Sequence, residues 1–71
     1  MAKLPVLSGR ELIKILKKVG FEVVRQKGSH VSLQKEQFRT VVPLHSELAK
    51  GTLIAILHQC GISREEFDKI K

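Results

Sequence analysis

The middle of the chain constrains its fold more than any other part. Three β-rich segments, over residues 21–26, 30–35 and 38–42, are separated only by short polar links. Links this short join antiparallel strands, because parallel neighbours need a crossover of about a dozen residues or more. Pro43 follows the third segment and has no N–H group with which to continue a strand. We therefore predict a three-stranded antiparallel sheet.

The second segment indicates which side of this sheet is buried. Val31 and Leu33 alternate with His30, Ser32 and Gln34. Side chains point to opposite faces at successive positions of a strand, so the two apolar residues share one face and the three polar residues share the other. We expect the apolar face to be covered by helices and the polar face to lie in water.

Helical patterns flank the sheet on both sides. Residues 9–19 carry apolar side chains at helical spacing, and the motif Ser8-Gly9-Arg10-Glu11 at their start is typical of a capping box. A second helix is expected with Thr52 as its N-cap and a stop at Gly61. Ser63-Arg64-Glu65-Glu66 repeats the capping-box pattern and predicts a short C-terminal helix. The predicted class is α+β, in the order α-β-β-β-α with a helical tail and with the helices on one face of the sheet.

Length and charge limit what the chain can do. Its 71 residues allow a single domain over 1–71. No apolar run approaches the ~18 residues that cross a membrane, and the N-terminus has no signal-peptide core, so we expect a cytoplasmic protein. Thirteen Lys and Arg against seven Asp and Glu give a net charge of +6, which suits a polyanionic partner. The single Cys60 excludes an internal disulfide, and no metal site is expected, because no ligand spacing supports one.

His30 is the strongest candidate for chemistry. It follows a tight turn, and Arg25 and Lys27 come just before it. An imidazole can exchange a proton near neutral pH, and cations can hold the phosphates of RNA. RNA supplies its own nucleophile, the 2′-hydroxyl, so a general acid or base beside bound phosphates is a workable catalyst. A lone exposed histidine is more often without function, and the residues alone leave that interpretation open.

The remaining candidates are weaker. His45 lies just past the third segment, and we interpret it as an anchor of an irregular loop over residues 44–50. His58 lies on the flank of the second helix, where exposure to solvent is the default. Gly51-Thr52 at a helix start offers N–H groups that can bind an anion, but a capping role there needs no ligand.

Short motifs follow one another along nearly the whole chain. They are Ser8-Gly9-Arg10-Glu11, Lys18-Val19-Gly20-Phe21, Arg25-Gln26-Lys27-Gly28-Ser29-His30, Val42-Pro43-Leu44-His45, Gly51-Thr52-Leu53, Ile56-Leu57, Gly61-Ile62-Ser63 and Glu66-Phe67. With these motifs in this order and spacing, the chain resembles the HicA toxins of bacterial and archaeal toxin–antitoxin systems, which are small endoribonucleases that cleave mRNA.

The resemblance implies a fold like that of double-stranded-RNA-binding domains. It also implies that the histidine of the Gly-Ser-His motif, His30, is the catalytic residue, and that a HicB-like antitoxin covers that face and blocks cleavage. We expect a monomer when the chain is free, a hetero-oligomer with the antitoxin, and no cofactor. The residues expected to bind RNA around His30 are Arg25, Lys27, Gly28, Ser29, Lys35 and Arg39.

Two other functions fit the same residues. One is a non-catalytic RNA-binding module that grips duplex RNA by its shape. Such modules carry a basic cluster at the start of the last helix, whereas Lys50 stands nearly alone here. The other is a protein-interaction domain whose sheet edge takes a partner strand, and it leaves the net charge unexplained. We therefore predict a metal-independent ribonuclease toxin that cleaves single-stranded mRNA.

Overall fold

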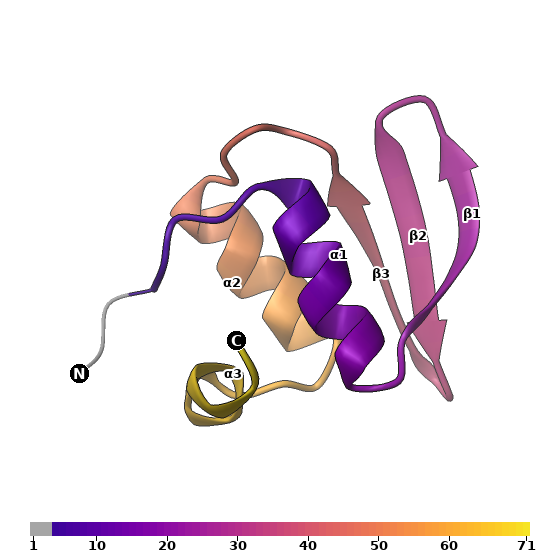
Figure 1. Ribbon diagram of the computed structural model, residues 1–71. Coiled ribbons are helices and arrows are strands. Elements are labelled where there is room, and N and C mark those ends of the chain that lie inside the picture. Colours follow the sequence, from indigo (N-terminus) through magenta and orange to yellow (C-terminus); the bar gives the residue numbers. More distant parts are fainter. Residues whose placement is uncertain (1–3) are drawn as a thin grey trace.

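A three-stranded sheet with helices on one side forms the body of the protein, as the computed structural model describes it for residues 4–71 (Figure 1). The elements are α1 (Gly9–Lys18), β1 (Glu22–Lys27), β2 (His30–Lys35), β3 (Phe38–Pro43), α2 (Lys50–Gln59) and α3 (Arg64–Ile70). The sheet is antiparallel, with the order β1-β2-β3. The predicted class and element order are confirmed.

Both predicted capping boxes are present. At the start of α1 the Ser8 hydroxyl accepts the Glu11 N–H at 3.1 Å, and the Glu11 carboxylate accepts the Ser8 N–H at 2.9 Å. The second of these bonds is the main reason that the pKa of Glu11 is lowered. Ser63 and Glu66 form the same pair of bonds at the start of α3. Each cap uses backbone N–H groups that a helix start leaves unpaired.

The predicted start of α2 is wrong. The helix begins at Lys50, its N-cap is Ala49, and no side chain caps it, so Thr52 lies inside the first turn. A contact from the N-terminal segment sets this start, because buried Leu48 donates its N–H to the Leu7 carbonyl at 2.7 Å. That bond fixes the chain two residues before the helix, and tertiary packing therefore outweighs the local preference for a threonine cap.

The predicted bounds of β2 are confirmed, whereas those of β1 and β3 differ from the observed ones by one residue. Phe21 is buried and donates its N–H to the Leu16 carbonyl at 3.0 Å, so it closes α1 and the first strand begins after it. Lys27 pairs directly with His30, which extends β1 and reduces the turn to two residues. Pro43 is the last residue of β3.

The core lies between the helices and the two strands β2 and β3. Val31 and Leu33 are buried, as the alternation predicts, while His30 and Gln34 are exposed. All three helices contribute buried apolar side chains. The buried core residues outside β2 are Leu12, Leu16, Phe21, Val42, Leu48, Leu53, Ile56, Leu57, Cys60 and Phe67. None of the six residues of β1 is buried. The sheet therefore has one strand that the helices leave uncovered.

Candidate nucleic-acid site

His30 opens β2 at the end of the sheet where β1 turns into β2. Its register partners are Lys27 on β1 and Pro43 on β3. Directly paired residues of an antiparallel sheet project from the same face, with Cβ atoms about 5 Å apart. The imidazole and the Lys27 side chain therefore lie side by side on the face that no helix covers, and both are exposed.

The turn before His30 is held in one position. Gly28 has a φ of +59°, a backbone angle that residues other than glycine rarely adopt. The Ser29 carbonyl accepts the Leu44 N–H at 2.7 Å, so the turn is bonded to the chain that leaves β3. A further bond joins the Gln26 amide to the Gly28 carbonyl at 3.3 Å. These bonds fix the backbone from which the imidazole projects.

The start of α1 supports the same end of the sheet. The Gly9 N–H donates to the His45 carbonyl at 2.9 Å, and a Cβ atom on Gly9 would collide with the Pro43 carbonyl. His45 therefore anchors its loop through its backbone, as we interpreted, while its side chain is exposed. The close approach of Gly9 to the Pro43 carbonyl was not predicted, although a glycine at the first position of a helix is a signal of such an approach.

Arg25 joins Lys27 and His30 on the open face of the sheet. It pairs with Ser32, which follows His30 on the same side of β2. None of the ion pairs recorded within residues 4–71 involves Arg25 or Lys27. Two exposed cations therefore stand beside the imidazole without a carboxylate neutralising them, and their charge is available to an anionic ligand.

The structure does not bring Lys35 and Arg39 next to His30. Lys35 ends β2, about 17 Å along the strand from His30 at ~3.4 Å per residue. Its ammonium donates to the Val19 carbonyl at 2.6 Å and so holds the C-terminal end of α1. Arg39 pairs with Gln34 and is exposed on the open face near the same distant end. Their part in RNA binding stays a prediction.

Other reactive groups lie outside this site. Cys60 is buried, and burial raises the pKa of its thiol to about 11, which keeps it protonated and a poor nucleophile. His58 is exposed on α2, as expected. Within residues 4–71 no three His, Cys, Asp or Glu side chains are grouped so that they could hold a metal ion. In the same part of the chain, no helix has the length and apolar character to cross a membrane.

Comparison with known proteins identified one family. A family model described as the HicA toxin of bacterial toxin–antitoxin systems matches residues 9–62 of the 71-residue chain. The matched range runs from the first residue of α1 past the end of α2, and it includes the turn that presents His30. Neither the curated proteins nor the solved structures gave a match.

Proposed function

The chain belongs to the HicA toxin family, and we propose that it is an endoribonuclease that cleaves single-stranded mRNA with His30 as its general acid or base. The observation that carries this proposal is the pairing of His30 with Lys27 on the open face of the sheet. An exposed imidazole beside an unneutralised cation can meet a phosphodiester without any element moving aside. The family membership supports a toxic activity, and cleavage of mRNA is the activity that this face can perform.

The proposed reaction needs one nucleophile, which the substrate carries. The 2′-oxygen of RNA attacks the adjacent phosphorus and loses its proton, the bond to the 5′-oxygen of the next nucleotide breaks, and that oxygen gains a proton. A 2′,3′-cyclic phosphate and a free 5′-hydroxyl result. His30 serves one of the two proton transfers, either as the base at the 2′-oxygen or as the acid at the 5′-oxygen.

The cations contribute to the same reaction by charge. Negative charge grows on the phosphoryl oxygens as the 2′-oxygen attacks, and fixed positive groups lower the energy of that state. Lys27 stands directly opposite His30, and Arg25 stands opposite the next residue on that face of β2. We assign Lys27 to the reacting phosphate and Arg25 to a neighbouring phosphate. Gly28 and Ser29 set the turn, and the exposed Gly28 leaves room for an RNA backbone.

A partner that covers this face would stop the reaction. We propose that a HicB-like antitoxin does so, because the exposed site has no segment within residues 4–71 lying across it. The free toxin is then active without any further change, and binding of the partner controls its cleavage of RNA.

The decisive experiment compares His30→Ala with His58→Ala. Both changes remove an exposed imidazole, but His58 lies on α2, away from the proposed site. Cleavage of a single-stranded RNA should fall ~10²–10⁴-fold in His30→Ala and stay unchanged in His58→Ala, because only the former loses a proton-transfer group. Gel analysis of a labelled RNA in EDTA measures the rate, with DNA of the same sequence as an uncleaved control.

Two results would contradict the proposal. Equal rates for His30→Ala and the unchanged chain would remove the histidine from the mechanism. An unchanged chain that binds RNA without cutting it would instead support the non-catalytic RNA-binding module. Circular dichroism should show both variants folded, since the replacement of an exposed side chain changes stability by only about ±0.5 kcal/mol.

A further inference from the structure

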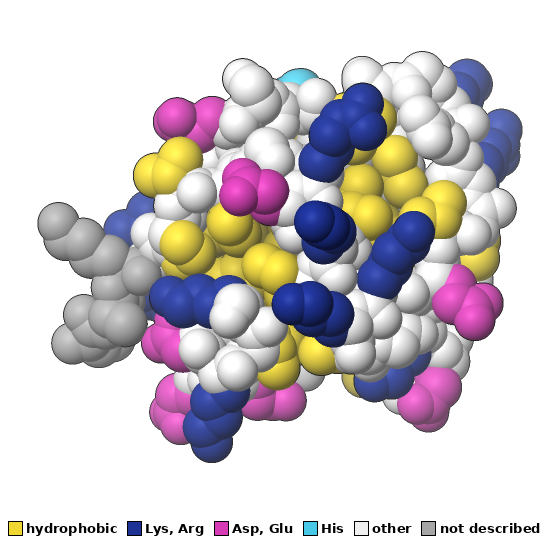
Figure 2. Space-filling model, viewed as in Figure 1, with side chains coloured by type: hydrophobic (Ala, Val, Ile, Leu, Met, Phe, Trp, Pro, Cys, Tyr) yellow, Lys and Arg dark blue, Asp and Glu magenta, His cyan; other side chains and the backbone are white. Residues whose placement is uncertain are grey.

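A groove between α1 and β1 lies on the side of the sheet opposite His30. Its floor is apolar and is formed by Ile13, Val23 and Leu44. Its helical wall is basic and carries Arg10, Lys14 and Lys17, and no acidic side chain lines it. Figure 2 shows this face of the molecule, with exposed apolar side chains between Lys and Arg side chains. This surface is therefore partly hydrophobic and strongly positive.

An irregularity in β1 brings Val23 into the groove. The register between β1 and β2 shifts between Val23 and Arg25, so that Val24 is an extra residue, a β-bulge. Val23 consequently pairs with buried Leu33 and faces the helical side of the sheet. No helix covers it there, and 41% of its surface stays exposed. An apolar side chain on the core side of a sheet is thus left without a cover.

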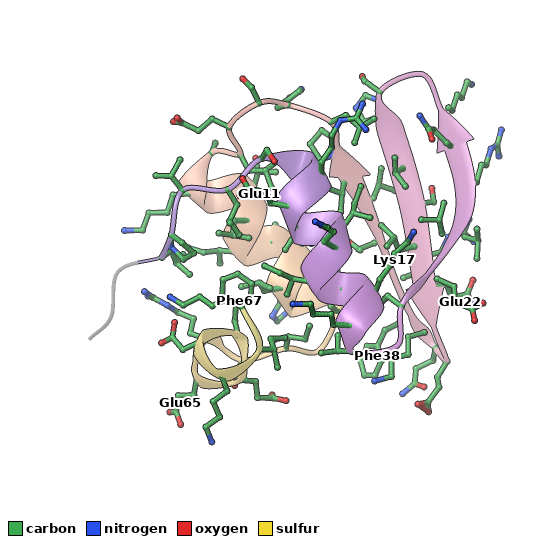
Figure 3. The ribbon with its side chains drawn as sticks, viewed as in Figure 1. Glu11, Lys17, Glu22, Phe38, Glu65 and Phe67 are labelled. Atoms are coloured by element: carbon green, nitrogen blue, oxygen red, sulfur yellow. The ribbon has the colours of Figure 1, made fainter. Side chains whose placement is uncertain are left out.

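The stability of α1 explains only part of the basic wall, because Lys17 lies in the last turn, where a cation is favourable, whereas Arg10 lies in the first turn, where it is not. Arg10, Lys14 and Lys17 lie at helical spacing and form one row, and like charges four residues apart weaken a helix by about 0.2–0.5 kcal/mol per pair. None of the three belongs to an ion pair recorded within residues 4–71. Figure 3 shows Lys17 extending from α1 on the side of the strands. The row is positioned to meet negative charge at the groove.

We propose that this groove binds an acidic segment of the partner antitoxin, with apolar side chains on Ile13 and Val23 and carboxylates on the basic row. Charge complementarity selects this occupant. A second copy of the chain carries the same net charge of +6 and would be repelled. RNA would satisfy the basic row but leave the apolar floor uncovered, and the bulge in β1 disfavours the addition of a partner strand at that edge.

The groove gives the partner a binding site that is separate from the face that carries His30. An antitoxin held there can reach over the sheet end to His30 with another part of its chain. The identification of the partner as an antitoxin rests on the proposed function, whereas the acidic and apolar chemistry of the segment rests on the groove itself.

Charge reversal at two adjacent lysines tests the proposal. Lys17 lines the groove, whereas Lys18 lies beside it in the last turn of α1 and lines a different hollow with Pro5 and Lys71. Lys17→Glu and Lys18→Glu change the net charge equally. The probe is the purified cognate HicB-like antitoxin of the proposed function, and its affinity for each full-length variant is measured by calorimetry. We expect Lys17→Glu to weaken binding roughly tenfold or more, with little change in Lys18→Glu.

A second pair of variants tests the apolar floor. Val23→Thr keeps the shape of the side chain but places a hydroxyl in the groove, and Val24→Thr makes the same change on the bulge residue, outside the groove. The antitoxin should bind Val23→Thr several-fold more weakly than Val24→Thr, because the hydroxyl would be buried without a partner.

The outcomes separate this proposal from the proposed function. Equal antitoxin affinities for Lys17→Glu and Lys18→Glu would overturn it. A Lys17→Glu variant that loses RNA cleavage but binds antitoxin normally would also overturn it, because the groove would then be a binding site for RNA. The supporting result is weakened antitoxin binding with RNA cleavage by the free variant at the normal rate. If the unchanged chain does not cleave RNA at all, the proposed function fails while the affinities still decide the groove.

Discussion

β1 and β3 are the two edge strands of one small sheet, each six residues long, yet their surroundings differ completely. β3 buries Thr40 and Val42 and packs against both α1 and α2, and the Thr40 hydroxyl donates to Gln59 of α2 at 2.7 Å. β1 buries nothing and is held through its pairing with β2. The difference indicates that β3 maintains the fold, whereas β1 is free to carry charged residues for function.

The largest expected effect is on folding, from the same substitution made in each strand. Val42→Asp places a carboxylate at a position with 0% exposure in β3, and Val24→Asp places one on β1, where 49% of the valine is exposed. A buried unpaired charge costs roughly 3–5 kcal/mol, which is comparable with the whole stability of a domain of this size. Val42→Asp should be unfolded at 25 °C by circular dichroism.

Val24→Asp should stay folded in the same measurement, with a loss of about 1 kcal/mol or less from its lower strand preference. A Val24→Asp variant that unfolds like Val42→Asp would break the comparison, since β1 would then be as necessary to the fold as β3.

The next effect is on catalysis, from the loss of one positive charge on each strand. Lys27→Met and Arg39→Met both remove an exposed cation from the open face, but only Lys27 stands opposite His30. We expect cleavage to fall roughly tenfold to a hundredfold in Lys27→Met, because a fixed charge beside the reacting phosphate is lost. Arg39→Met should change the rate of RNA cleavage less, in single-turnover measurements at saturating enzyme. Equal losses would show that the charge acts from both ends of the sheet.

The smallest effect is on the salt dependence of RNA binding. If Arg25, Lys27, Lys35 and Arg39 each neutralise one phosphate of a single strand, log K against log salt should have a slope of about −3. Arg25→Met with Lys27→Met should reduce it to about −1.5. If the Lys35 ammonium instead keeps its bond to the Val19 carbonyl, the slope of the unchanged chain should be about −2, and Lys35→Met should leave it nearly unchanged. A loss of about 0.7 in Lys35→Met, the contribution of one phosphate, would mean that this bond opens to bind RNA.

The fold could be predicted because its main determinants are local. The Ser8 and Ser63 caps need only a glutamate three residues later, and the alternation around Val31 shows which face is buried. The start of α2 could not be predicted in this way. It depends on the bond from Leu48 to Leu7, and residues so far apart in sequence meet only once the chain is folded.

The candidate site was predictable where its residues are neighbours in the chain. His30 and Lys27 flank a two-residue turn, so any hairpin brings them together. Lys35 and Arg39 were grouped with them because they are basic and lie nearby in sequence, but strand length carries both to the other end of the sheet. The groove was missed because the bulge at Val24, which turns Val23 towards α1, leaves no mark in the alternation of β1.

The bond from the Leu44 N–H to the Ser29 carbonyl has a consequence for the proposed binding of RNA. A loop that orders only when its substrate arrives loses about 1–2 kcal/mol of binding free energy for each residue that it fixes. The turn of this protein is already fixed by its partner strand and by the chain after β3. If RNA binds at His30 as we propose, it meets an imidazole whose backbone has little further entropy to lose, and most of the contact energy with the phosphates then remains available as affinity.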